Sequence, residues 1–135
     1  YFGQKDAQQV LLVQRMIHDF NHDITLRPVA IVRDDDGLAL SSRNEFLSEQ
    51  EREAALVISR TLALMRENSL NRGFESIDLE SARARINSTE GVRLDYLELV
   101  DPSNFQPPTA DSKRVLALVA AYVGSTRLID NMDLL

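Results

Sequence analysis

The sequence predicts a mixed fold of helices and strands in two parts, an α/β part over residues 1–47 and an α+β part over residues 48–135. Three observations lead to this prediction. The hydrophobic pattern of the first part indicates a strand, a helix and a further strand, the order of a parallel βαβ unit. The second part shows two helical patterns and then three strand patterns, as expected for two helices on a mainly antiparallel sheet. The chain has only five glycines and four prolines, which argues against a loop-rich β protein.

The first part opens on the end of a strand and a turn into a helix. Tyr1-Phe2-Gly3 is typical of a strand end, and Gly3 permits the sharp bend that follows. Asp6 is predicted to cap a helix that runs to about Asn21. The apolar residues of this helix recur at three- and four-residue steps and predict one buried face: Val10, Val13, Ile17 and Phe20. Because a protein rarely begins at the end of a strand, we expect an N-terminal truncation.

A second strand and a turn are predicted next. The strand begins at Ile24–Leu26, is broken by Pro28 and resumes over Val29–Val32. The sequence Asp34-Asp35-Asp36-Gly37 indicates a turn. A short segment then leads to a domain boundary at about residue 47.

The second part begins with a helix whose start is marked by a capping box, formed by Ser48 and Glu51. This helix is expected to end near Asn68, with Gly73 beyond it. Its predicted inward residues are Ala54, Ile58, Thr61, Leu62 and Met65. A second helix is predicted over residues 77–87, with Leu79, Ala82 and Ile86 on one face.

Three strands are predicted after the helices. In residues 92–100 the alternation of apolar residues changes phase, which indicates a bulge. A proline-containing loop follows over residues 101–111. Residues 115–123 are apolar on both faces and predict a covered or central strand. Gly124-Ser125 is predicted to form a two-residue hairpin turn with Gly first, before a returning strand over residues 126–131.

Composition excludes several classes of function. The net charge of −6 gives no basic footprint for nucleic acid and no attraction to anionic membranes. The absence of cysteine excludes disulfides, thiolate metal sites and a cysteine nucleophile. The longest apolar run, nine residues from Val115 to Val123, falls far short of the roughly 20 that span a bilayer. With no signal peptide visible, we expect a cytoplasmic protein.

The turn before the first helix is one candidate for phosphate binding. Lys5 lies at a helix N-terminus, where a lysine and free backbone N–H groups can meet a phosphate. Asp6 could accept hydrogen bonds from ribose hydroxyls. Gln8 and Gln9 can both donate and accept, which suits a hydroxy-acid substrate. Taken alone, these residues are equally compatible with a capped helix that carries a solvated lysine and surface glutamines.

The segment Ser41-Ser42-Arg43-Asn44 is a second candidate. Hydroxyls and a guanidinium together hold phosphate oxygens and can stabilise charge on a leaving pyrophosphate. A polar linker before the Ser48 cap is the alternative.

Other polar clusters are poor candidates. Residues 34–36 lack the spacing of a calcium loop and are interpreted as a solvated turn. His18 and His22 have no further ligands that would complete a zinc site, and too few partners for a Ser-His-Asp hydrolase. The sequence contains no G-x-S-x-G element, no P-loop and no G-x-G-x-x-G.

Two segments together resemble the pantothenate synthetase (pantoate–β-alanine ligase) family: Phe-Gly-Gln-Lys-Asp-Ala-Gln-Gln at residues 2–9 and Asp-Gly-Leu-Ala-Leu-Ser-Ser-Arg-Asn at residues 36–44. Arg15-Met16, residues 95–99 and residues 126–131 are also similar to that family. The resemblance extends over essentially the whole chain. It implies that residues 1–47 are the C-terminal part of a Rossmann-like nucleotide-binding domain, and that residues 48–135 are a small C-terminal domain.

The resemblance implies an ATP-dependent, AMP-forming reaction. Pantoate and ATP give pantoyl adenylate and pyrophosphate, and the amine of β-alanine then displaces AMP to give pantothenate. The family's H-x-G-H element and its acidic magnesium site are absent, so the chain resembles only the C-terminal half and is not expected to be active alone. Magnesium is expected for the full-length enzyme, with no ligand identified in this chain. The implied partners are the missing N-terminal half and, in the full-length protein, a second copy in a homodimer.

The resemblance also implies roles for single residues. Lys5 would hold the phosphates of ATP, Asp6 and the backbone of Gly3 the ribose, and Gln9 the pantoate. Ser41, Ser42 and Arg43, which resemble the KMSKS loop of class I aminoacyl-tRNA synthetases, would hold the β- and γ-phosphates. Val32 and Leu40 would lie against the adenine. The competing hypothesis is a non-catalytic nucleotide-binding or interaction module derived from such a ligase. An H-x-G-H element encoded upstream of Tyr1 would favour the ligase, and a methionine codon there would favour the module.

Overall fold

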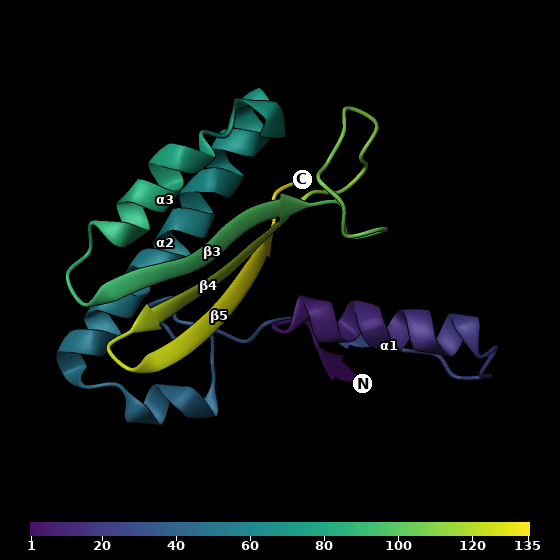
Figure 1. Ribbon diagram of the computed structural model, residues 1–135, viewed down its shortest axis with the longest axis horizontal. Coiled ribbons are helices and arrows are strands. Elements are labelled where there is room, and N and C mark those ends of the chain that lie inside the picture. Colours follow the sequence, from purple (N-terminus) through teal and green to yellow (C-terminus); the bar gives the residue numbers. More distant parts are fainter.

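The computed structural model describes residues 1–135 and has a mixed α/β fold with a small parallel sheet, three α-helices and a three-stranded antiparallel sheet. The predicted βαβ unit is confirmed. Strand β1 (Phe2–Gly3) and strand β2 (Pro28–Val29) pair in parallel, with helix α1 (Ala7–Asp19) between them. Figure 1 shows α1 reaching away from the other helices, next to the N-terminus.

Helix α1 buries less than its sequence predicts. Asp6 caps it as expected, since its side chain accepts a hydrogen bond from the backbone N–H of Gln9, but the helix ends at Asp19. Of the residues predicted to form its buried face, only Val10 is buried, and Phe20 is 72% exposed. Val13 and Ile17 are partly buried, so the prediction is wrong only for Phe20, which lies past the end of the helix.

Strand β2 is shorter than predicted, and Ile24–Leu26 forms no strand. Pro28, expected to break the strand, lies within it. The backbone N–H of Phe2 donates to the carbonyl of Arg27, and that of Gln4 donates to Val29. This side of the ladder therefore uses carbonyls that flank Pro28 and needs no N–H group from the proline.

Helices α2 (Glu49–Arg72) and α3 (Leu79–Asn87) begin the second part. The capping box of Ser48 and Glu51 is present. Helix α2 continues past the predicted end at Asn68 and stops at Gly73, whose φ of 85° is readily adopted by glycine. Helix α3 starts later than predicted because the side chain of Asp78 caps it. A 3₁₀ helix, η2 (Phe74–Ser76), lies between the two.

The antiparallel sheet contains β3 (Val92–Val100), β4 (Leu116–Val123) and β5 (Thr126–Asp133), with β4 in the centre as predicted. The predicted bulge in β3 is confirmed by a shift of register between Leu94 and Tyr96. The two-residue turn at Gly124-Ser125 is also confirmed, and Gly124 has a φ of 58°.

The two faces of this sheet have different neighbours. Helices α2 and α3 cover one face (Figure 1), where the main hydrophobic core contains Leu62, Ile86 and Leu97. On the other face the start of α1 and the loop after β3 meet the sheet, where Ala7 and Phe105 pack with Leu116 and Leu118. None of the helices has the length and apolar character needed to cross a membrane. This second face therefore has less cover than the first, and it lies beside the turn that carries Lys5.

Candidate functional site

The first part of the candidate site is the turn between β1 and α1. Gly3 ends the strand, and no atom lies within 4 Å of where a Cβ would stand on it. Lys5 follows, half-buried, and Asp6 caps the helix through one carboxylate oxygen, 3.2 Å from the N–H of Gln9. The turn therefore places a lysine and an acidic cap at a helix N-terminus, as the sequence predicted.

The second part is a tight loop between residues 32 and 44. Its ends are joined because the N–H of Leu40 donates to the carbonyl of Val32 at 2.9 Å, and Arg33 and Ala39 form an antiparallel bridge. Gly37 turns the loop with a φ of 94°. The loop leads into the 3₁₀ helix η1 (Ser42–Phe46), which begins with the predicted phosphate-binding residues.

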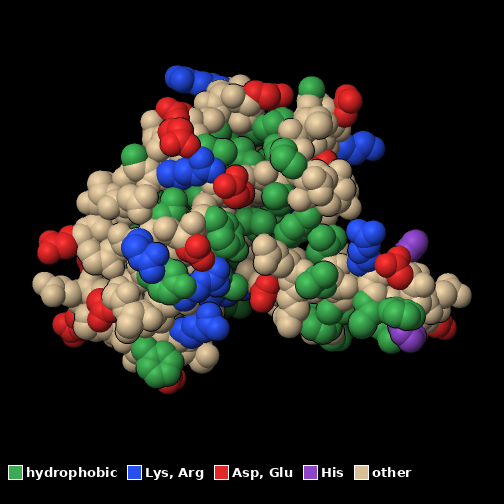
Figure 2. Space-filling view, viewed as in Figure 1, with side chains coloured by type: hydrophobic (Ala, Val, Ile, Leu, Met, Phe, Trp, Pro, Cys, Tyr) green, Lys and Arg blue, Asp and Glu red, His purple; other side chains and the backbone are tan.

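The structure brings these two parts together. The ammonium group of Lys5 donates a hydrogen bond to the backbone carbonyl of Leu40 at 3.1 Å, across 35 residues of sequence. The guanidinium of Arg43 donates to the backbone carbonyl of Arg127 in β5 at 3.3 Å. Figure 2 shows Lys and Arg side chains gathered over the end of the sheet that lies beside η1.

Several cations therefore lie around Lys5. Burial lowers the pKa of Lys5 below its ordinary value of 10.5. The carboxylate of Asp130 opposes this shift of the Lys5 pKa, and the positive charges of Arg43 and Arg33 add to it. A partly desolvated ammonium among guanidinium groups favours the binding of an anion.

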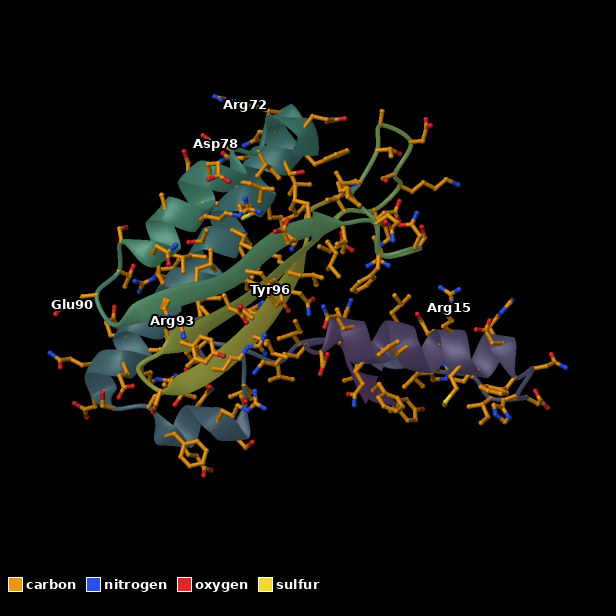
Figure 3. All side chains as sticks on the ribbon, viewed as in Figure 1. Arg15, Arg72, Asp78, Glu90, Arg93 and Tyr96 are labelled. Atoms are coloured by element: carbon orange, nitrogen blue, oxygen red, sulfur yellow. The ribbon has the colours of Figure 1, made fainter.

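A small cavity of about 100 Å³ opens beside this cluster, between the start of α1 and the sheet. Its polar lining includes Lys5, Asp6, Gln8, Tyr96 and Arg127. Figure 3 shows Tyr96 on the sheet, near the beginning of α1. The site thus combines both candidate segments with residues of the antiparallel sheet.

The remaining predicted residues differ in their placement. Ser41 is half-buried and its hydroxyl accepts from the N–H of Arg43 at 3.2 Å, whereas Ser42 is exposed. Val32 and Leu40 are 60% and 47% exposed, so two adjacent apolar side chains face solvent. Gln9 is exposed on α1 and does not line the cavity.

The acidic turn and the histidines lie outside this cluster. The turn predicted at residues 34–37 is present, but it is not merely solvated. Arg52 of α2 pairs with Asp34 at 2.7 Å and with Asp36 at 3.0 Å. His18 lies at the exposed end of α1, where its contact is Asp19. The acidic turn therefore joins the loop to α2.

Sequence reasoning missed three residues that support the site. Arg33 pairs with Asp130 through two contacts of 2.7 and 2.8 Å. The side chain of Asn131 donates to the carbonyls of both Gln4 and Lys5. Two adjacent polar residues directly after the apolar pair Leu128-Ile129 are the signal that could have indicated a buried network.

Comparisons with known proteins identify the family. The family model for pantoate-beta-alanine ligase matches residues 1–133. A pantothenate synthetase of Paenarthrobacter aurescens (strain TC1) is 50% identical over 99% of this chain and 47% of its own length. The crystal structure of pantothenate synthetase from Thermus thermophilus superposes with a TM-score of 0.89 and 38% identity, over 99% of this chain and 49% of that one.

A third relative carries ligands. The pantoate-beta-alanine ligase from Francisella tularensis, crystallised in complex with beta-gamma ATP and beta-alanine, matches with a TM-score of 0.68 and 32% identity. It aligns over 98% of this chain and 42% of its own. The chain spans about half the length of the curated relatives it matches. With a family model that covers nearly every residue, this chain belongs to the pantoate–β-alanine ligase family.

Proposed function

We propose that this chain is the C-terminal half of an ATP-dependent, AMP-forming ligase that condenses pantoate with β-alanine through pantoyl adenylate. The observation that carries the proposal is the contact between Lys5 and the carbonyl of Leu40, which joins the two segments that would hold the nucleotide. In this proposal residues 1–47 end a Rossmann-like nucleotide-binding domain, and residues 48–135 form a small C-terminal domain. The full-length protein would be a homodimer.

In the first reaction step, a carboxylate oxygen of pantoate attacks the α-phosphorus of ATP. The bond between this phosphorus and the oxygen that bridges to the β-phosphate breaks, and pyrophosphate leaves with the bonding electrons. Lys5 and Arg43 would stabilise the charge on this leaving group, and Ser41 and Ser42 would donate hydrogen bonds to it. Their proximity to one another supports this role.

In the second step, the amine of β-alanine attacks the acyl carbon of pantoyl adenylate, AMP leaves, and the amine loses a proton. Because β-alanine brings its own nucleophile, the protein contributes mainly orientation and charge stabilisation. Gln9 would hold pantoate, and the second carboxylate oxygen of Asp6 would accept from the ribose, near the backbone of Gly3. The exposed side chains of Val32 and Leu40 would lie against the adenine.

Magnesium is expected to accompany ATP in the full-length enzyme, and we identify no ligand for it in this chain. The structure contains no group of three or more His, Asp or Glu side chains placed to hold a metal ion. Two members of the acidic turn, Asp34 and Asp36, are already paired with Arg52. We therefore assign no step to a metal held by this chain.

The proposal is tested by pantoate-dependent exchange of labelled pyrophosphate into ATP, measured on the protein encoded by the whole reading frame. Removal of one preorganised donor to a developing negative charge typically lowers the rate about a hundredfold. We expect losses of that order for Lys5→Ala and for Arg43→Ala. Lys113→Ala and Arg66→Ala are matched controls, because both side chains are exposed and neither lines the cavity. Equal rates in the site variants and the controls would refute the assigned roles.

A non-catalytic nucleotide-binding module is the second candidate. It would keep the Lys5–Leu40 contact and the cation cluster as a nucleotide-binding site without the reaction. A module of this kind would bind ATP and show no pyrophosphate exchange in any form of the protein.

A further inference from the structure

Strand β5 contains two adjacent polar residues that are almost completely buried. Asp130 is 5% exposed and Asn131 is 3% exposed. A buried carboxylate or amide is unfavourable unless it finds hydrogen-bonding partners. The partners of both residues lie in the candidate site, more than 90 positions away in the sequence.

Asn131 holds the turn that carries Lys5. Its side-chain nitrogen donates to the carbonyl of Gln4 at 2.8 Å and to the carbonyl of Lys5 at 2.9 Å. Since both partners can only accept, the orientation of the amide is fixed and both of its N–H groups are used. The backbone around Lys5 is therefore attached to β5 by a single side chain.

Asp130 holds the loop that leads to Ser41 and Arg43. Its two carboxylate oxygens accept from the guanidinium of Arg33 at 2.7 and 2.8 Å. The same guanidinium donates to the carbonyl of Gly37 at 3.1 Å, within the turn of that loop. A bidentate pair of this kind fixes both distance and angle.

Consecutive residues of a strand point to opposite faces, so Asp130 and Asn131 reach different neighbours from one place in β5. Asn131 thus binds the turn that carries Lys5, and Asp130 separately binds Arg33 in the loop that leads to Ser41. We propose that Asp130 and Asn131 are positioning residues, which set the Lys5 turn and the Ser41–Arg43 loop at a fixed separation for binding the phosphates of ATP. This inference rests on the proposed function.

The electrostatics agree with this arrangement. Burial lowers the pKa of Lys5, and the charges of Arg43 and Arg33 lower it further. The carboxylate of Asp130 raises this pKa and so opposes the lowering. It therefore supports the charged form of Lys5 while it holds Arg33.

Asn131 is the better residue to vary, because a change at Asp130 leaves the Arg33 guanidinium without its carboxylate. Asn131→Ala removes both hydrogen bonds to the turn. Asn131→Asp keeps the shape but places a carboxylate against two carbonyl oxygens. Ile86→Val, on the buried face of α3, is the control for a general loss of stability that does not touch the turn.

The kinetic test measures single-turnover formation of pantoyl adenylate by the full-length protein. Each variant is made in two backgrounds, one that keeps Lys5 and one that carries Lys5→Ala. A misplacement of about 1 Å can lower a rate by roughly a hundredfold. When Lys5 is present, we expect Asn131→Ala to slow the reaction about 10- to 100-fold and to raise the ATP concentration that gives the half-maximal rate. In the Lys5→Ala background it should have less than about a twofold effect, since it acts through Lys5. Asn131→Asp should be at least as slow, and Ile86→Val unchanged.

An equal loss in both backgrounds, or a similar loss in Ile86→Val, would overturn the positioning role. Hydrogen exchange of this chain gives a readout independent of activity. Asn131→Ala should speed amide exchange at residues 2–6 relative to residues 62–65 of α2, and unchanged exchange at residues 2–6 would also overturn the inference. If the full-length wild type forms no adenylate, the proposed function fails, whereas hydrogen exchange still decides whether Asn131 holds the turn.

Discussion

Lys5 is the residue whose environment bears most directly on function. It is half-buried, bonded to the carbonyl of Leu40, and surrounded by Arg33, Arg43 and Asp130. A lysine in these surroundings gives up its proton more readily than an exposed lysine.

The lowered pKa of Lys5 predicts the pH at which adenylate formation begins to fall on the alkaline side of its pH profile. The ammonium form, needed to hold phosphate, is lost at a pH below its ordinary pKa of 10.5. Adenylate formation should therefore fall at a lower pH in the wild type than in Lys5→Arg, because arginine keeps its charge. The measurement is the pH dependence of pantoate-dependent pyrophosphate exchange in the full-length protein. Coincident alkaline limbs in the two proteins would contradict this role for Lys5.

The same pKa has a consequence for stability. Because folding lowers the pKa of Lys5, the unfolded chain binds more protons than the folded chain between the two pKa values. The unfavourable contribution of Lys5 is fully present below the folded pKa and is relieved as the pH rises toward 10.5. Relative to Lys5→Met, the free energy of unfolding of the wild type should increase over this interval, as urea denaturation at several pH values can show. A constant difference would contradict the shift.

At the scale of elements, helix α2 has one face in the main core and one in solvent. Leu62 is fully buried, and Leu64, two residues later, is 40% exposed. This pair provides an internal comparison of packing on a single helix.

Leu62→Ala should lower the free energy of unfolding by about 2–5 kcal/mol, since it removes buried contacts and leaves a cavity. Leu64→Ala should lower it by less than about 1 kcal/mol, as is usual for an exposed position. Chemical denaturation of both variants measures the difference. Similar losses in the two would show that this part of α2 does not pack as described.

Sequence predicted the elements whose signals are local. The caps at Asp6 and Ser48 and the turn at Gly124-Ser125 were recognised because their hydrogen bonds or dihedral angles involve residues a few positions apart. The central strand β4 was recognised because all of its residues are apolar, and in the structure all but Tyr122 are buried. By contrast, Ile24–Leu26 was predicted as a strand from composition, although no partner strand pairs with it.

The candidate site was predictable only in part. Its two segments carry residue types that suggest phosphate chemistry, and the family resemblance gave them roles. The contact between Lys5 and Leu40 and the pairing of Arg33 with Asp130 join residues 35 and 97 positions apart. No local sequence pattern indicates contacts between residues so far apart in the chain, because these contacts depend on how α1 and the loop pack against β5.

At the scale of the whole molecule, the first part of the chain leaves an apolar stripe exposed along α1. Leu12, Met16 and Phe20 follow one another at four-residue steps and are 68%, 49% and 72% exposed. Figure 2 shows hydrophobic side chains along this helix, up to the histidines at its end. Contiguous apolar surface of this kind favours association.

We therefore expect this chain to self-associate in a concentration-dependent manner. The combined variant Leu12→Ser and Phe20→Ser should sediment closer to the monomer mass in analytical ultracentrifugation. Leu70→Ser is the matched control, because Leu70 is 61% exposed on α2, away from the stripe. A wild-type chain that stays monomeric at all concentrations would contradict this expectation.

The most direct test of the proposed ligase function is pantoate-dependent exchange of labelled pyrophosphate into ATP, measured in parallel on this chain and on the protein encoded by the whole reading frame. We expect exchange in the longer protein alone, because in this proposal the chain supplies the phosphate-binding residues and the rest of the full-length protein supplies the other half of the site. Absence of exchange in both would contradict the proposal that these residues belong to an adenylate-forming ligase, and would favour the nucleotide-binding module.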